Sequence, residues 1–384
     1  MYGTCAAGFE VVREEFERNF AERGDVGASV AVTVDGEFVV DLWGGDADEV
    51  GSRPWERDTV VNVYSAGKGM VALCAHVLAD RGELDLDAPV AKYWPEFAQA
   101  GKQNLPVRWL LSHRAGLIGP RERMARGDVY DWDRVCATLA ASEPWWEPGT
   151  AQGYHAITFG FLVGEVVRRI TGDSLGTFLR TEIAEPLGAD LFIGTPAEEH
   201  ARCADVIGQV QPSKMGPGTL TPPRELSDNP MAAFLVAFTY IPADDVNSAR
   251  WRAAEVPGIN AHANAHGLAT VYGALATGGL VGGDTLETMR SQQSQPNELD
   301  LVISSMAGSG PPFTWGTGYQ LNGFGLLGPN HATFGHLGAG GSYACADPEN
   351  RMSYAYAMNK LSADPQSDQR NNKLLQAVYS AIGA

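Results

Sequence analysis

Strand-like patterns occur near both ends of the chain and are scarce between them. Near the N-terminus, ASVAVTVDGEFVVDLWGG alternates apolar and polar residues around Asp35-Gly36, a pair typical of a tight antiparallel hairpin. Near the C-terminus, strand patterns return in FTWGTGYQLN, ATFGHLGAGGSYACADPE and RMSYAYAMNK. The most economical arrangement is one sheet built from both chain ends. We therefore predict a sheet with a helical region inserted between its two parts.

Helical patterns account for most of the remaining chain. We expect an amphipathic helix over about 8–23 and another near the C-terminus, in NNKLLQAVYSAIG. Residues 67–79 also follow helical spacing, and this helix should end near Arg81-Gly82, because glycine readily closes a helix. From there to about Gly283, helical patterns alternate with breaks such as PWWEPGT and TPPRELSDNP.

The chain has 384 residues, which is more than one hydrophobic core usually supports. We therefore predict two domains. Residues 1–80 together with 285–384 would form an α/β sheet domain, and residues 81–284 a mostly helical domain. The active site would lie between them.

Net charge and cysteine content limit the cellular environment and the classes of partner that we expect for this chain. A net charge of -18 argues against nucleic acid and anionic membranes, because a surplus of Lys and Arg is absent. Five cysteines, an odd number without close spacing, fit reduced and mostly buried thiols. No basic patch with an apolar core begins the chain, and no run reaches the roughly 18 to 20 apolar residues of a membrane span. We expect a soluble, cytoplasmic protein.

The segment VVNVYSAGKGMVALCAHVLADRG places Ser65 three residues before Lys68. Residues three apart share a helix face, so the hydroxyl and the amine can meet. Lys68 precedes an apolar run, and a partly desolvated lysine loses its proton readily enough to activate a serine. A helix N-terminus also stabilises negative charge that develops in acyl transfer. Taken alone, the pair is better explained by an N-capping serine followed by a solvated lysine.

Four stretches together resemble one known group of proteins. YSAGKGM is similar to the first motif of the serine beta-lactamase and penicillin-binding-protein superfamily, in particular its class C-like branch, which includes family VIII carboxylesterases, D-aminopeptidases and DD-peptidases. WLLSHRAGL, GYHAITFGFLVGEVVRRITG and FGHLGAGGSYACADPE resemble its later motifs in the same order. The resemblance covers nearly the whole chain. It implies an α/β (α+β) fold of the beta-lactamase/transpeptidase type, with an antiparallel sheet flanked by N- and C-terminal helices plus a large helical region.

The resemblance also implies roles for individual residues. Ser65 would be the acylated nucleophile and Lys68 its base. Tyr154 would pass a proton to the leaving group and back, and we expect a neighbouring ammonium to lower the pKa of its hydroxyl. The backbone N–H groups of Ser65 and Ala339 would form the oxyanion hole. Without the other motifs, Tyr154 would be interpreted as a ring that packs in the core.

His336 stands where beta-lactamases usually carry the lysine of Lys-Thr-Gly. The stretch His336-Leu337-Gly338 resembles a His-x-Gly variant of some peptidases and esterases. Its imidazole could hydrogen-bond the substrate or Tyr154, although it is no permanent charge near neutral pH. The alternative is a structural histidine that ends a strand. Gly338 would allow the substrate to approach the backbone closely.

Two departures from the family pattern point toward ester cleavage. The Tyr-x-Asn motif reads Tyr154-His155-Ala156, which removes a carboxamide, and the third motif has no lysine. We therefore expect weak or no beta-lactamase activity. His155 either replaces the missing Asn or is an exposed ring beside the pocket. Trp146, in the pair Trp145-Trp146, either packs in the core or lines an acyl pocket.

Two other patterns are not expected to carry chemistry. Residues 172–176 match Gly-x-Ser-x-Gly, but that motif needs a preceding strand, and a helix is predicted there instead. Ser174 should therefore cap the helix that follows, in LGTFLRTEI. His262 and His266 lie four residues apart, but no glutamate or third ligand accompanies them, so we expect no zinc.

The sequence thus predicts a metal-independent and cofactor-free serine hydrolase that cleaves small carboxylic esters through an acyl-enzyme on Ser65. Its partner would be a small-molecule ester or amide. The alternatives are a D-amino-acid peptidase or amidase, an acyltransferase of the same fold, and a catalytically idle scaffold or binding protein. The presence of Ser65, Lys68 and Tyr154 together argues against the scaffold.

Overall fold

The computed structural model describes residues 1–121, 124–125, 127–208, 245–296, 298–303, 313–323, 325–362 and 368–383. Part of the middle region that we predicted to be rich in helices, residues 209–244 with the TPPRELSDNP break, lies outside the described residues. The description below concerns the described part of the chain.

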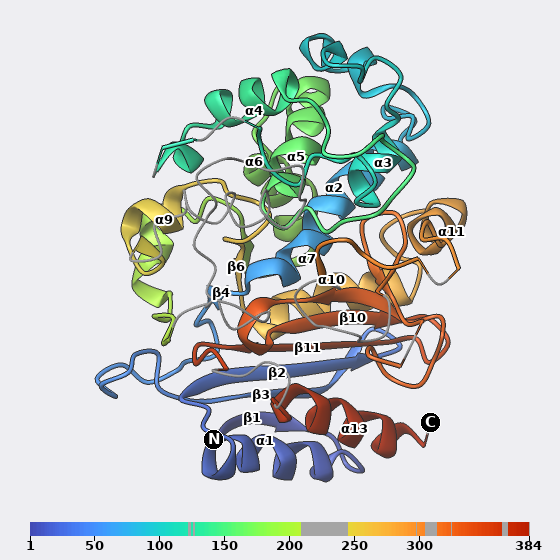
Figure 1. Cartoon of the computed structure of the whole chain (residues 1–384). Helices are drawn as coiled ribbons and strands as arrows, with labels where there is room; N and C mark the ends of the chain where they lie inside the picture. The colour runs from blue at the N-terminus through green and yellow to red at the C-terminus, as the bar shows by residue number, and fades with distance from the viewer. Residues whose placement is uncertain are drawn as a thin grey trace.

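Both ends of the chain build one sheet (Figure 1). Its strands run in the order β1-β3-β2-β11-β10-β9-β8-β7, and all paired neighbours are antiparallel. The two ends meet at the β2–β11 pair in the middle of the sheet, so the predicted fold class is confirmed. The strands are β1 (Tyr2–Cys5), β2 (Gly27–Val34), β3 (Glu37–Gly45), β7 (Thr314–Trp315), β8 (Gln320–Leu321), β9 (Phe334–Leu337), β10 (Tyr343–Asp347) and β11 (Met352–Met358).

The predicted hairpin joins β2 to β3. Val34 pairs with Glu37 across the two-residue turn. Asp35 has φ 52° and Gly36 has φ 85°, so both central residues are in the left-handed region that the commonest hairpin turns require. The Asp-Gly pair is therefore the local reason for this tight connection.

Helices cover both faces of the sheet (Figure 1). On one face, α1 (Glu10–Glu22) packs beside α13 (Arg370–Ile382), which brings the first and last helices of the chain together. On the other face, α10 (Ala265–Ala276) lies against β2, β10 and β11. Since α10 comes from the middle of the chain, the helical region and the sheet share a packed contact. The division into domains at residues 80 and 284 stays a prediction.

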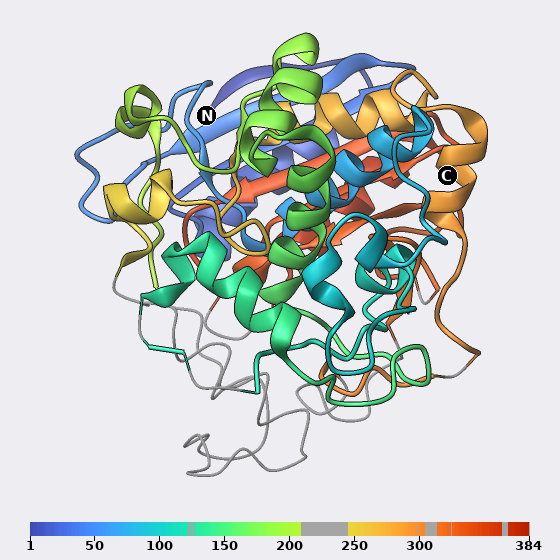
Figure 2. The same cartoon turned by 90° about the horizontal axis from the view of Figure 1, so that it is seen from above.

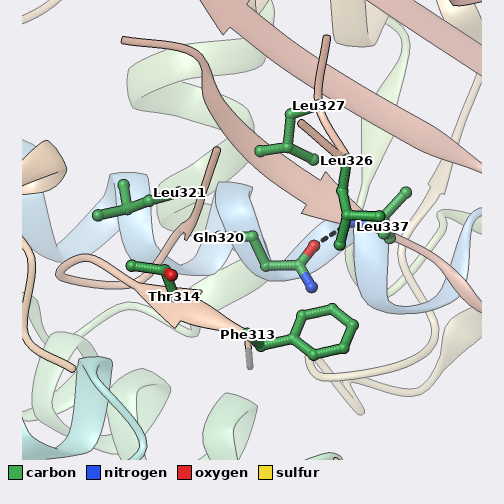
Figure 3. Close-up of a pocket in the computed structure, with 7 residues that line it drawn as sticks. All are labelled: Phe313, Thr314, Gln320, Leu321, Leu326, Leu327 and Leu337. Carbon is green, nitrogen blue, oxygen red and sulfur yellow. Dashed lines mark hydrogen bonds between the residues drawn. The ribbon is translucent and has the colours of Figure 1, made fainter. Parts of the chain in front are cut away.

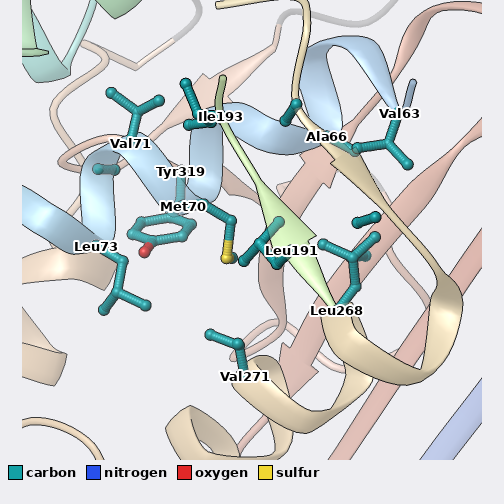
Figure 4. Packing of buried hydrophobic residues seen from close by; sticks show 14 of the residues in the cluster. Val63, Ala66, Met70, Val71, Leu73, Leu191, Ile193, Leu268, Val271 and Tyr319 are labelled. Carbon is teal, nitrogen blue, oxygen red and sulfur yellow. The ribbon is translucent and has the colours of Figure 1, made fainter. Parts of the chain in front are cut away.

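Helix α2 (Lys68–Asp80) runs through the middle of the molecule (Figures 1 and 2). All its residues from Lys68 to Leu78 are buried, and it packs against α5 (Thr158–Thr171) and α6 (Leu175–Leu179). Figure 4 shows its apolar side chains, such as Met70 and Leu73, beside Leu191 and Leu268 from other elements. Burial on all sides fixes the place of the helix and therefore of its N-terminus.

A small second sheet leads into α2. It has the order β4-β6-β5 and consists of β4 (Val61–Asn62), β5 (Leu191–Phe192) and β6 (His262–Ala263). The remaining α-helices are α3 (Val107–Leu111), α4 (Trp132–Ala141), α7 (Glu185–Leu187), α9 (Ala249–Ala253) and α11 (Gly283–Arg290). Short 3-10 or π-helical segments lie at Val90–Lys92, Pro95–Ala98, Asp128–Tyr130, Arg180–Ala184 and Ala197–Arg202.

Two expectations about the chain's environment can be compared with the structure. All five cysteines are free thiols and four of them are buried, as predicted. None of the helices in the described part of the chain combines the length and the apolar character needed to span a membrane.

Candidate active site

Ser65 lies in η1 (Tyr64–Gly67), a short 3-10 turn between β4 and α2. The preceding Tyr64 has φ 48°, an unusual conformation for a bulky residue, and its N–H donates to Oδ1 of Asn62 at 3.2 Å. This local strain turns the chain sharply from the strand into the helix. Ser65 is thereby placed at the N-terminal end of α2.

The Lys68 amine is completely buried beside Ser65. Its Nζ donates to Oγ of Ser65 at 3.0 Å and to the carbonyl oxygen of Gly258 at 2.6 Å. Both acceptors are neutral, and burial lowers the pKa of Lys68 well below its ordinary value. The site therefore favours the neutral amine, which can accept a proton from Ser65.

Tyr154 completes the group around Ser65. Its ring centroid lies 4.9 Å from Nζ of Lys68. Burial raises the pKa of Tyr154, and a hydrogen bond with Ser65 only partly opposes this shift. The expectation of a lowered tyrosine pKa is therefore wrong, because a lysine that is itself driven toward neutrality provides little positive charge. The phenol is held in its protonated form, as a proton donor.

Residues that the sequence analysis did not single out hold Tyr154 in place. Its backbone N–H donates to Oδ1 of the buried Asp300 at 3.1 Å, and Asp300 also accepts from Nε1 of Trp315 at 3.3 Å. The Trp315 ring stacks on Tyr154 with centroids 5.5 Å apart, and His113 meets the same ring edge-on at 5.0 Å. His113 lay within the quoted WLLSHRAGL stretch, whereas Asp300 and Trp315 belong to no motif.

His155 and Trp146 support the loop that carries Tyr154. His155 is fully buried, its Nδ1 lies 2.7 Å from the carbonyl oxygen of Gly153, and its Nε2 accepts from Leu117 N–H at 2.9 Å. The alternative of an exposed His155 ring is wrong, because both ring nitrogens bind backbone groups inside the protein. Trp146 donates from Nε1 to the carbonyl oxygen of Ala151 at 3.0 Å, and its ring covers Gly153.

His336, on β9, faces the same centre. Its ring centroid lies 6.1 Å from that of Tyr154 and 5.7 Å from that of Trp315. Nδ1 lies 2.6 Å from the carbonyl oxygen of Leu337, whereas Nε2 is buried with no hydrogen-bond partner among the residues that the structure describes. Burial lowers the pKa of His336 to about 3. The ring is therefore neutral and offers Nε2 as an acceptor.

Gly338 brings the end of β9 against η1. A Cβ atom at this position would lie 2.4 Å from the carbonyl oxygen of Val63 and 3.2 Å from the nitrogen of Ala66, so no side chain fits. The turn that follows, η9 (Ala339–Gly341), packs against η1. This close approach brings the turns that carry Ser65 and Ala339 together.

A shallow apolar pocket lies at the end of the sheet, beside Leu337 (Figure 3). Gln320 accepts from Leu337 N–H at 2.8 Å on its wall. The space open to a water-sized molecule is only about 10 Å³, which suits a single water molecule rather than an acyl chain. Its lining residues are Phe313, Thr314, Gln320, Leu321, Leu326, Leu327 and Leu337.

The other candidate residues lie apart from this centre. Ser174 is the N-cap of α6, as predicted, and its side chain accepts from Thr177 N–H. His262 lies on β6 and binds the carbonyl oxygen of Asn260, whereas His266 lies in α10 and pairs with Asp41 at 3.0 Å. The described residues contain no cluster of three or more histidine, cysteine or acidic side chains arranged to hold a metal ion.

Comparison with known proteins gives consistent matches over the whole length. A family model described as Beta-lactamase matches residues 16–378. The chain is 35% identical to Esterase/beta-lactamase LipL of Mycobacterium tuberculosis, over 94% of this chain and 83% of that protein. A crystal structure of a family VIII carboxylesterase has a TM-score of 0.86 at 44% identity, with 99% of each chain covered. A penicillin-binding protein homologue from Caulobacter crescentus has a TM-score of 0.86 at 39% identity, also with 99% of each chain covered.

Gly338→Ala should separate β9 from η1 and weaken the reactivity of Ser65. We expect an organophosphonate probe to label the variant about 100-fold more slowly than the wild type, since a displaced oxyanion donor costs a loss of that order. Gly283→Ala is the matched control, because no atom lies within 4 Å of a Cβ there. Equal labelling rates in a folded Gly338→Ala protein would contradict the role of this close approach.

Proposed function

The chain belongs to the beta-lactamase family, and we propose that it is a serine hydrolase that cleaves small carboxylic esters through an acyl-enzyme on Ser65. The observation that carries this proposal is the buried Lys68 amine, hydrogen-bonded to the Ser65 hydroxyl with only neutral partners. Relatives named esterase and carboxylesterase support the choice of ester substrates.

In the first half of the reaction, neutral Lys68 takes the Ser65 proton along the 3.0 Å hydrogen bond. Oγ attacks the ester carbonyl carbon, and the carbonyl oxygen becomes an oxyanion. The backbone N–H groups of Ser65 and Ala339 stabilise that charge at the N-terminal end of α2. When the intermediate collapses, the C–O bond to the alcohol breaks and the acyl group stays on Ser65.

Tyr154 serves the leaving group. As a phenol with a raised pKa, it donates its proton to the departing alkoxide, and the Lys68 ammonium returns a proton to the tyrosine. In the second half of the reaction, deacylation, a water molecule attacks the acyl carbon and gives its proton to the Tyr154–Lys68 pair. Ser65 regains its proton from that pair when the carboxylic acid is released. His336 supports these steps by accepting a hydrogen bond at Nε2 from Tyr154 or the substrate.

The same site is poorly suited to beta-lactams. A neutral His336 offers no permanent positive charge to a substrate carboxylate, and Ala156 provides no carboxamide. Amide cleavage and acyl transfer remain alternatives that use the same acyl-enzyme. An idle scaffold is disfavoured, because a binding protein has no need of a desolvated lysine on a serine. A cytoplasmic location stays a prediction, which rests on the free cysteines.

Ser65→Ala should abolish ester hydrolysis. With p-nitrophenyl butyrate and a metal chelator present, we expect kcat/KM to fall at least about 1,000-fold, because no other group replaces the nucleophile. Ser174→Ala is the matched control and should retain wild-type turnover, since Ser174 caps a helix. The proposal would be falsified if Ser65→Ala kept its activity, or if Ser174→Ala lost it.

His336→Gln should lower kcat/KM about 10-fold without changing the shape of its pH profile. A group whose folded pKa is about 3 is protonated only below that pH, so His336 stays neutral from pH 5 to 9. Loss of one hydrogen bond accounts for a change of that size. The exposed His331 offers a control, His331→Gln, with unchanged rates. A wild-type titration near pH 6.5 that disappears in His336→Gln would contradict the neutral role.

A further inference from the structure

The Arg370 side chain lies buried behind η9, at the start of α13. Its five N–H groups all have acceptors. Nε and Nη2 bind the Asp368 carboxylate, with Nη2 at 2.6 Å from Oδ2. Nη1 donates to Oδ1 of Asp25 at 2.7 Å and to the carbonyl oxygen of Lys360 at 2.8 Å, and Nη2 donates to the carbonyl oxygen of Gly340 at 2.9 Å. The full donor set of an arginine is therefore used.

The charges around Arg370 are withdrawn from solvent. The Asp25 side chain has no exposed surface, and the Arg370 side chain is 4% exposed. Tyr356 donates its hydroxyl to the other Asp25 oxygen at 2.5 Å. Burying such a cluster costs desolvation free energy that well-packed apolar side chains would avoid. Stability alone is thus a weak reason for its presence.

The turn that Arg370 contacts depends on two glycines for its shape. In η9, Gly340 has φ 84° and Gly341 has φ 125°, both in the region that favours glycine. The Gly340 carbonyl oxygen accepts from Ser362 N–H at 3.2 Å and from Arg370. A Cβ on Gly341 would lie 3.2 Å from Oδ2 of Asp368 and 3.4 Å from Nη2 of Arg370, so the ion pair also packs directly on this turn.

We propose that Arg370 is a positioning residue that holds η9 in the geometry in which the Ala339 N–H serves the oxyanion. The inference rests on the proposed function, because it assigns a support to that oxyanion hole. Arg370 touches neither the substrate nor Ser65. It acts through the Gly340 carbonyl, one residue beyond Ala339, and Asp25 and Asp368 fix the plane of its guanidinium.

Lysine cannot reproduce this arrangement. An ammonium keeps the positive charge next to Asp25 and Asp368, but it has three donors and no planar fork. Arg370→Lys therefore retains the positive charge but loses hydrogen bonds. We expect the hydrogen bond to the Gly340 carbonyl oxygen to be weakened or lost. This makes the conservative variant the informative one.

The test compares Arg370→Lys with the wild type in ester turnover and in inhibition by phenylboronic acid, whose tetrahedral adduct on a serine carries its negative charge in the oxyanion hole. We expect kcat/KM to fall about 10-fold and the boronate inhibition constant to rise by a similar factor, with KM changed less than about two-fold. Arg252→Lys, at the partly buried Arg252–Asp205 pair outside η9, is the matched control and should change neither value.

A purely structural role would lower the thermal midpoint of Arg370→Lys and leave boronate affinity and kcat/KM at wild-type values, which would overturn the proposal. If Arg370→Lys does not fold, Asp368→Asn replaces it, with an expected loss of about three-fold in both quantities; wild-type values there would also overturn it. A different result would contradict the proposed function itself, namely ester turnover by the wild type that does not depend on Ser65, or no turnover at all.

Discussion

The burial of Lys68 is the constraint on which the rest of the site depends. Its amine binds two neutral oxygen atoms, those of Ser65 and Gly258, and burial favours its uncharged form. A solvated lysine would stay protonated at neutral pH and could not activate a serine. The apolar surroundings of α2 therefore have a chemical consequence, because the packing that stabilises the helix also makes its first residue a base. The raised pKa of Tyr154 follows from the same burial, and the two groups together provide a base and an acid.

The sheet and the helical region both contribute to the position of this site. The centre of the sheet joins β2 to β11, and from there β10 and β9 lead to Gly338, where the absence of a side chain allows contact with η1. Tyr154, in the loop before α5, is held by Asp300 and by Trp315 on strand β7. Arg370 extends the connection to α13 on the far face of the sheet (Figure 1). Segments that are distant in the sequence thus converge on a few atoms around Ser65.

Local patterns predicted local structure well. The Asp35-Gly36 hairpin, the helix after Ser65 and the capping role of Ser174 depend on neighbouring residues, and each is present in the structure. The motifs also brought Ser65, Lys68 and Tyr154 to one place. Effects that depend on distant segments were not predicted. An exposed His155 ring was one of two alternatives, but the ring is buried, and the pKa of Tyr154 is raised where a lowered value was expected. Both outcomes depend on burial by segments far away in the sequence. Asp300 and Arg370 belong to no motif, and the contacts of Asp300 with Tyr154 and of Arg370 with Asp25 join residues far apart in the sequence.

The most direct test of the central claim is to trap the acyl group during turnover and locate it. The wild type would be quenched in acid within the first turnovers of p-nitrophenyl butyrate, followed by intact mass measurement and peptide mapping. Our account predicts the mass increase of one butyryl group, carried by the peptide that contains Ser65. A butyryl group on Ser174 or on another residue, or burst-free turnover with no adduct even when deacylation is slowed by low pH, would contradict it.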